Sequence, residues 1–99
     1  MYGWNGTVSC DTIDCGQSCK PTINLLLYSS TGYADRNYYI QGSNDNSNWT
    51  KIYTGSGCGT IIRNNLTFNT SYRYYKATIE GNTDGGNPSI GINVAYIKN

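Results

Sequence analysis

The feature that most constrains this chain is a period-two alternation of side chains near its C-terminus. In residues 74–80, Tyr75, Ala77 and Ile79 alternate with polar or charged neighbours, and apolar and small polar residues alternate in the same way in residues 89–96. Successive side chains of a β-strand point to opposite faces, so both segments are predicted to be strands with one buried face. No segment shows the spacing of an amphipathic helix, and the chain is therefore predicted to be all-β.

Further strands are predicted from short runs of β-branched and aromatic residues between clusters of Gly, Asn, Asp and Ser. The run that contains Leu25, Leu26 and Leu27 is predicted to be a central strand buried on both faces. The polar cluster at residues 44–48 is predicted to be the turn of a hairpin. Six or seven short strands that recur at intervals of roughly ten residues are typical of an antiparallel sandwich or barrel. The additional strands are predicted at residues 22–28, 38–43, 49–53, 60–63 and 66–68.

The length of 99 residues predicts one small domain with a modest core. Folding of such a chain buries only about 60–65% of the surface that is exposed when it is unfolded, so covalent crosslinks would help it. Residues 1–20 contain three of the four cysteines among turn-forming residues, and they are predicted to be a loop-like, cysteine-rich arm. Residues 21–99 are predicted to form the β-domain itself.

The four cysteines are Cys10, Cys15, Cys19 and Cys58. In oxidising surroundings they predict two disulfides in one of three pairings, each worth about 2–4 kcal/mol, with Cys58 tying the arm to the rest of the domain. A four-thiolate zinc site is the alternative. However, the intervals of four, three and thirty-eight residues between the cysteines lack the paired Cys-x2-Cys pattern of structural zinc sites. Free thiols are the third possibility.

Charge and composition exclude several classes of function. The chain has 7 basic and 6 acidic residues and a net charge of +1, without a basic cluster, so nucleic acid is not expected as a partner. No apolar run is long enough for a membrane span, so membrane insertion is not expected. Histidine is absent and no pair of carboxylates is placed for acid–base chemistry. We therefore expect a protein that is not an enzyme and has no cofactor and no metal.

Two segments resemble the discoidin-like family, whose domains are also called coagulation-factor 5/8 type C or galactose-binding-like. Residues 39–52 resemble the signature hairpin of the family, with a turn that contains Asp45 and with Trp49 opening the next strand. Residues 68–79 resemble its Tyr-Arg-Tyr strand, which precedes a final Ile-rich strand, here residues 90–97. Similar hairpins occur in phage tail and fibre modules. The family usually has a longer first part, often with a calcium-binding loop, where this chain has its cysteine-rich arm.

The resemblance implies a small jelly-roll-like β-sandwich, which the cysteine-rich arm would staple through disulfides. It also implies binding of carbohydrate, lipid or protein through loops, and rarely catalysis. Together with the alternation it places four side chains in the core: Trp49, Tyr75, Ile92 and Tyr96. Tyr33 and Arg36 precede the hairpin in a predicted loop, and Trp4 lies in the arm. These three are the candidate ligand-binding residues, because aromatic rings stack on the apolar faces of sugars and a guanidinium donates to hydroxyl groups. Partial burial at the edge of the domain is their alternative role.

The cysteines and the weakly charged, hydroxyl-rich composition suit the outside of cells, whereas the chain begins at Met1 without the apolar segment of a signal peptide. A virion protein would satisfy both observations. We therefore expect a non-enzymatic virion surface protein, a capsid-decoration or fibre-tip module, that contacts capsid or fibre proteins, surface glycans or both. A homo-oligomer or array would supply avidity for weak sugar contacts. A carbohydrate-binding module of a secreted or cell-surface protein is the alternative, and a zinc-binding adaptor is a third.

Overall fold

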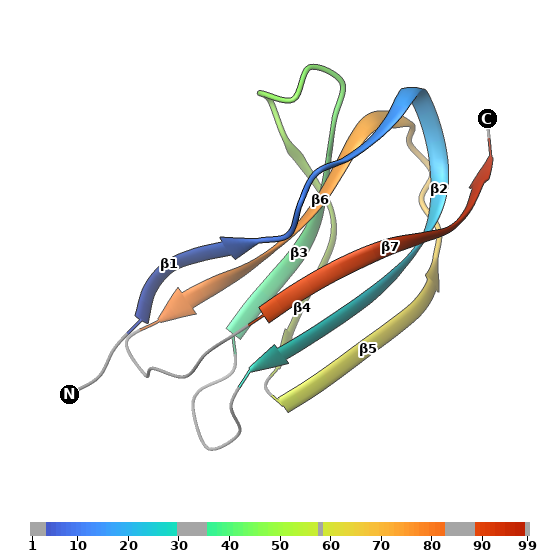
Figure 1. The fold of residues 1–99 in the computed structure, drawn as a ribbon. Helices are drawn as coiled ribbons and strands as arrows, with labels where there is room; N and C mark the ends of the chain where they lie inside the picture. Colours follow the sequence, from blue (N-terminus) through green and yellow to red (C-terminus); the bar gives the residue numbers. More distant parts are fainter. Residues whose placement is uncertain (1–3, 30–35, 58, 83–88, 99) are drawn as a thin grey trace.

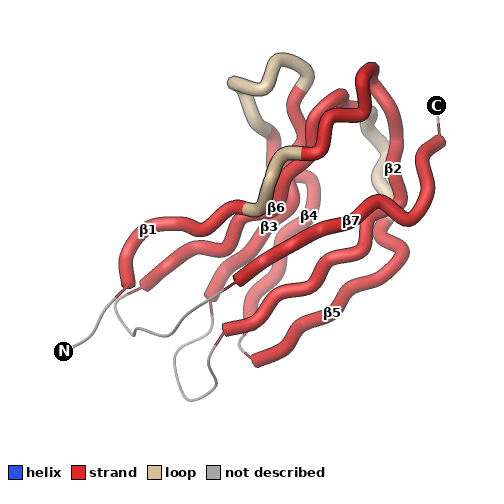
Figure 2. The backbone as a smooth tube through the Cα atoms, viewed as in Figure 1, coloured by secondary structure: helices blue, strands red, loops and turns tan. Residues whose placement is uncertain are grey.

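The computed structural model describes residues 4–29, 36–57, 59–82 and 89–98. Within these residues the chain forms seven strands with antiparallel pairing and no helix, so the predicted all-β class is confirmed (Figures 1 and 2). The strands are β1 (Trp4–Ser9), β2 (Ile13–Ser29), β3 (Arg36–Ser43), β4 (Thr50–Gly57), β5 (Gly59–Leu66), β6 (Tyr72–Asn82) and β7 (Ser89–Lys98).

The long strand β2 organises the sheet. Its first part, from Ile13 to Cys19, pairs with β6, and its second part pairs with β7 on one side and with β5 on the other. β3 lies between β6 and β4, and β1 pairs with the remaining length of β6. The strands thus form two groups, one of β1, β6, β3 and β4 and the other of β7 and β5. Figure 1 shows β2 arching from the first group to the second. This arch curls the antiparallel sheet around its own core.

The core side chains come from both parts of the curled sheet. Tyr75, Ala77 and Ile79 of β6 are fully buried, as their period-two spacing predicted. They belong to one cluster with side chains from β2, β3 and β5, so the two groups of strands share a single apolar core. The other buried hydrophobic members of this cluster are Cys19, Ile23, Leu25, Leu27, Tyr38, Ile40 and Ile61.

The structure corrects three expectations about the strands. The first twenty residues are not a loop-like arm, because β1 and the first part of β2 both pair with β6. The Leu-rich run is not buried on both faces, since Leu26 is 55% exposed and Tyr28 is 45% exposed. The two separate strands predicted at residues 60–63 and 66–68 are replaced by one strand, β5, which ends at Leu66.

The predicted hairpin around residues 44–48 is confirmed by the ladder between β3 and β4. The Asp45 carboxylate closes the turn by accepting hydrogen bonds from the backbone N–H groups of Ser47 and Asn48, at 2.9 and 2.8 Å, and from the Ser43 hydroxyl at 2.9 Å. These donors, the backbone N–H of Asn48 first, hold the pKa of the Asp45 carboxyl well below its usual range. Asn46 has a φ of 60°, a left-handed conformation that asparagine tolerates.

Candidate functional site

The candidate site is a groove on the outer face of β7, β2 and β5. Residues that lie opposite each other in an antiparallel ladder point to the same face of the sheet. Leu26 of β2 therefore shares the outer face with its two ladder partners, Gly91 of β7 and Ile62 of β5. The groove has a volume of about 750 Å³. It is lined by Asn24, Leu25, Leu26, Tyr28, Thr60, Ile62, Asn64, Ser89, Ile90, Gly91, Ile92 and Asn93.

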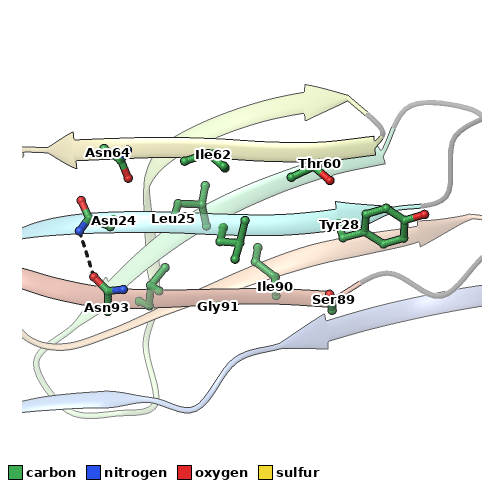
Figure 3. A pocket seen from close by; sticks show the side chains of 12 residues that line it. Asn24, Leu25, Tyr28, Thr60, Ile62, Asn64, Ser89, Ile90, Gly91 and Asn93 are labelled. Carbon is green, nitrogen blue, oxygen red and sulfur yellow. Dashed lines mark hydrogen bonds between the residues drawn. The ribbon is translucent and has the colours of Figure 1, made fainter.

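The floor of the groove is apolar and accessible. Leu26 is 55% exposed and Ile62 is 54% exposed, so two aliphatic side chains from adjacent strands present apolar surface to solvent. Gly91, on the other side of Leu26, leaves room there, because no atom lies within 4 Å of the position that a Cβ would occupy. The ring of Tyr28 lies at one end of this floor (Figure 3).

Amide and hydroxyl groups surround the apolar floor. The asparagines gather at one end, and Thr60 and Ser89 lie near Tyr28 at the other (Figure 3). The Asn24 side chain donates from Nδ2 to Oδ1 of Asn93 at 3.1 Å, and its own Oδ1 accepts from the backbone N–H of Asn65 at 2.9 Å. These two bonds hold the Asn24 carboxamide in one orientation. The asparagine end of the groove is thus positioned by hydrogen bonds within the protein.

The side chains that line the groove are amides, hydroxyls, aliphatic groups and one phenol, with no formal charge among them. Such groups bind by hydrogen bonds, apolar contact and stacking on the aromatic ring. A ligand that carries a phosphate or carboxylate would lose its hydration there without gaining an opposite charge. The groove therefore suits a neutral ligand with both hydroxyl groups and apolar CH faces.

A contrasting face lies on the outer side of β4, β3 and β6. Lys51 Nζ lies 4.2 Å from the ring centroid of Tyr39, and Lys76 Nζ lies 4.3 Å from a ring of Trp49. Both contacts are within the range of cation–π interactions. A second, more polar pocket of about 380 Å³ includes Tyr39, Lys51 and Glu80 among its lining residues. This charged and aromatic face differs in chemistry from the groove.

The three candidate ligand-binding residues are Arg36, Trp4 and Tyr33, and the structure describes the first of them fully. Arg36 is the first residue of β3 and only 1% exposed, so its predicted position in the loop before the hairpin is wrong. Trp4 is the first residue of β1 and pairs with Asn82 of β6. Tyr33 lies outside the described residues. The described lining of the groove is built from other residues.

Of the four side chains predicted for the core, Tyr75 is fully buried and Ile92 packs against the core cluster from a partly buried position. Trp49 is not a member of that cluster. It is half-buried and contacts Lys76, so its place in the core is corrected. Tyr96 lies in β7 opposite Thr22, and the surroundings of its side chain are outside the described part of the structure.

The described cysteines, Cys10, Cys15 and Cys19, are free thiols, and Cys58 lies outside the described residues. The predicted disulfides are therefore not confirmed. Burial and a hydrogen bond with the Cys19 thiol raise the pKa of Cys15 to about 12. Within the described ranges, no three His, Cys, Asp or Glu side chains are grouped so that they could hold a metal ion. The same part of the chain has no helix that could cross a membrane.

The groove could not be predicted from the sequence, because Leu26 and Tyr28 lie in the run Leu25 to Tyr28, where every position is apolar and no alternation marks the exposed face. One signal was present. The alternation in residues 89–96 places Ser89, Gly91 and Asn93 on one face, and these residues form one wall of the groove. In comparisons with known proteins, no family model matches this chain and no curated protein sequence matches it.

Proposed function

We propose that this protein is a non-enzymatic virion surface protein that binds neutral carbohydrate in the groove of β7, β2 and β5. The observation that supports this proposal is the combination of an exposed apolar floor, an aromatic ring and a surrounding set of uncharged amides and hydroxyls. Sugars require this combination, because each pyranose ring has apolar CH faces and a perimeter of hydroxyl groups. Tyr28 offers a face for stacking, and Leu26 and Ile62 offer apolar contact.

The dimensions of the groove suit a short stretch of a sugar chain. Asn24 and Tyr28 mark its two ends on β2, and the four residue steps between them span roughly 13 Å at about 3.3 Å per residue. A ligand along the strands would meet the Tyr28 ring at one end and the Asn24–Asn93 pair at the other. Contacts over so short a length are individually weak. A homo-oligomer or an array on a particle would convert them into firm attachment through avidity.

The setting on a virion, with capsid or fibre proteins as partners, belongs to the same proposal. The low charge and the four cysteines in a short chain support a location outside cells. A discoidin-like, jelly-roll-like sandwich with disulfides in its N-terminal strands belongs to the same proposal, and the core shared by the two groups of strands supports the sandwich. The same groove would also serve a carbohydrate-binding module of a secreted protein. Co-sedimentation of the protein with virus particles from its source supports the first setting, and free monomer in the medium supports the second.

The test of the groove is a glycan array that holds neutral, sulfated and sialylated chains. We expect the wild-type protein to bind neutral chains. Tyr28→Ala removes the stacking ring and should weaken that binding about tenfold, which corresponds to roughly 1.4 kcal/mol. Gly91→Leu fills the open space beside Leu26 and should weaken it as well.

The matched control is Tyr39→Ala, which removes an aromatic ring from the charged face on β3. Its binding should equal that of the wild type. Wild-type protein that binds only acidic glycans, or binding that survives both Tyr28→Ala and Gly91→Leu, would refute the assignment of the groove.

A further inference from the structure

The ladder between β2 and β6 contains an irregularity that brings two cysteines together. Asp14 of β2 pairs with Tyr74 of β6, and Cys19 of β2 pairs with Tyr72. Between these two pairs, β2 advances five residues (14 to 19) while β6 advances two (72 to 74), so three residues of β2 are in excess. The excess residues must leave the regular ladder as a bulge.

The local backbone shows how the bulge forms. Gly16 has a φ of +79°, in the left-handed region that favours glycine, and its N–H donates to Oδ1 of Asp14 at 2.8 Å. Asp14 is fixed in turn by Arg73, whose Nε and Nη2 donate to its two carboxylate oxygens at 2.8 and 3.1 Å. Beyond the bulge, the Tyr75 hydroxyl donates to the carbonyl oxygen of Cys19 at 2.6 Å. Both ends of the bulge are therefore anchored to β6.

Cys15 is the first residue of this bulge, directly after Asp14, and Cys19 is the residue at which the ladder resumes. Two residue steps along β6 span about 7 Å, whereas five steps of an extended β2 would span about 17 Å. Asp14 and Cys19 therefore lie about 7 Å apart, and Cys15, the next residue after Asp14, is placed near the separation of about 4.4–6.8 Å between Cα atoms that a disulfide requires. Both side chains also contact the core cluster, Cys19 within it and Cys15 against it.

Cys10 is held elsewhere. Its Sγ accepts a hydrogen bond from the backbone N–H of Ala77 at 3.2 Å, and its own N–H donates to the Ala77 carbonyl at 3.0 Å. Ala77 lies three residues further along β6 than Tyr74, the partner of Asp14, which corresponds to roughly 10 Å. Cys10 is therefore less well placed than Cys19 to pair with Cys15.

We propose that Cys15 and Cys19 form an intrachain disulfide that closes the bulge of β2 when the protein meets a low-molecular-weight disulfide. The thiolate of one cysteine attacks the small disulfide, which forms a mixed disulfide and releases one small thiol. The second cysteine, after losing its proton, attacks the mixed disulfide and releases the other small thiol. Two protein thiols are thus oxidised to one disulfide, and one small disulfide is reduced to two thiols.

The crosslink acts at the bend on which the groove depends. Directly after Cys19, β2 leaves β6 and begins its ladder with β7 at Lys20. A disulfide across the bulge would fix the backbone at Cys19. It would therefore restrict the bend of β2 between its ladder with β6 and its ladders with β7 and β5. The inference does not depend on what the groove binds. The structure holds the reduced form, in which Cys15 and Cys19 are free thiols and interaction with Cys19 contributes to the raised pKa of Cys15.

The test is to oxidise the full chain, starting from its reduced form, with oxidised glutathione, block the remaining thiols and map the disulfides by mass spectrometry. Cleavage before Asp14 separates Cys10 from Cys15 and Cys19. We expect a peptide in which Cys15 and Cys19 are joined to each other. A link from Cys10 or Cys58 to either of them, or two blocked thiols at positions 15 and 19, would overturn the proposal.

Two double variants isolate the pairing. Cys10→Ser with Cys58→Ser leaves only Cys15 and Cys19, and it should lose both reactive thiols on oxidation while it stays monomeric. The matched control, Cys15→Ser with Cys58→Ser, leaves Cys10 and Cys19 and should form no intrachain disulfide, so that each cysteine remains either a free thiol or a mixed disulfide with glutathione. The oxidised form of the first variant should melt roughly 10 °C above its reduced form, because closure of even a short loop restricts the unfolded chain. An equal or lower melting temperature would contradict the proposal that the crosslink fixes the bend.

Discussion

Replacing Tyr75 by phenylalanine tests how the two groups of strands are joined. The Tyr75 hydroxyl lies in the core and serves two partners at once. It donates to the carbonyl oxygen of Cys19 on β2 at 2.6 Å and accepts from the backbone N–H of Tyr72 at 2.9 Å. Tyr75→Phe keeps the ring, and with it the apolar contacts, but removes both hydrogen bonds.

The expected loss follows from the burial of the two partners. The Cys19 carbonyl is in a buried bond, and leaving such an acceptor unsatisfied costs about 1–3 kcal/mol. The Tyr72 N–H is in a partly buried bond, and a typical net hydrogen bond contributes about 0.5–1.5 kcal/mol. Together they predict a loss of about 1.5–4.5 kcal/mol in the free energy of unfolding. This is a large share of the roughly 5–15 kcal/mol that stabilises a typical domain.

The measurement is urea unfolding followed by circular dichroism, with Tyr74→Phe as the matched control. Tyr74 is the neighbouring residue and points to the opposite face of β6. Its ring contacts the Arg73 guanidinium, and Tyr74→Phe keeps this ring. We expect Tyr74→Phe to remain within about 0.5 kcal/mol of the wild type. If Tyr75→Phe were equally neutral, the hydroxyl would not stabilise the junction between β2 and β6.

Two further predictions concern alkaline pH and a close approach of backbone to a ring. Burial raises the pKa of Tyr75 and of Cys15 to about 12, from ordinary values of 10.0 and 9.0. Because the folded state holds both protons more tightly, its stability should be complete below about pH 9 and fall as the pH rises towards 12, which urea midpoints measured from pH 8 to 11 will show. A flat profile would contradict this. Gly42→Ala places a methyl group against the ring of Tyr72 and should lower the free energy of unfolding by about 1–3 kcal/mol, whereas Gly91→Ala, which meets no atom within 4 Å, should not. Equal unfolding curves for the two variants would argue against the close approach of Gly42 to Tyr72.

The elements that could be predicted from the sequence are those in which local pattern and tertiary environment agree. Tyr75, Ala77 and Ile79 are spaced at period two and lie on the buried face of β6. The cluster at residues 44–48 contains the Asp45 side chain that closes its own turn. By contrast, β1 is made largely of small polar residues with no alternation, and its strand conformation depends on pairing with β6, which is distant in the sequence.

The candidate site could not be predicted for a related reason. Leu26 and Tyr28 lie in a continuous apolar run, and such a run looks the same whether one face or both faces are covered. Only the fold shows that, among the described residues, no strand covers the outer face of β2 there. Arg36 shows the reverse case. A charged residue next to a glycine-containing loop is expected to be exposed, but the start of β3 places it inside the protein.

The pairing of β2 with three later strands has a consequence for how the protein is made. β2 leaves the ribosome early, but its partners β5, β6 and β7 all follow later, and β7 begins only at Ser89. The apolar residues of β2 therefore remain unpaired while the intervening chain is synthesised. Assembly that depends on such distant pairings is slow and exposes unpaired strand edges to aggregation. Removal of β7 should therefore affect folding yield, and not only the wall of the groove that β7 supplies.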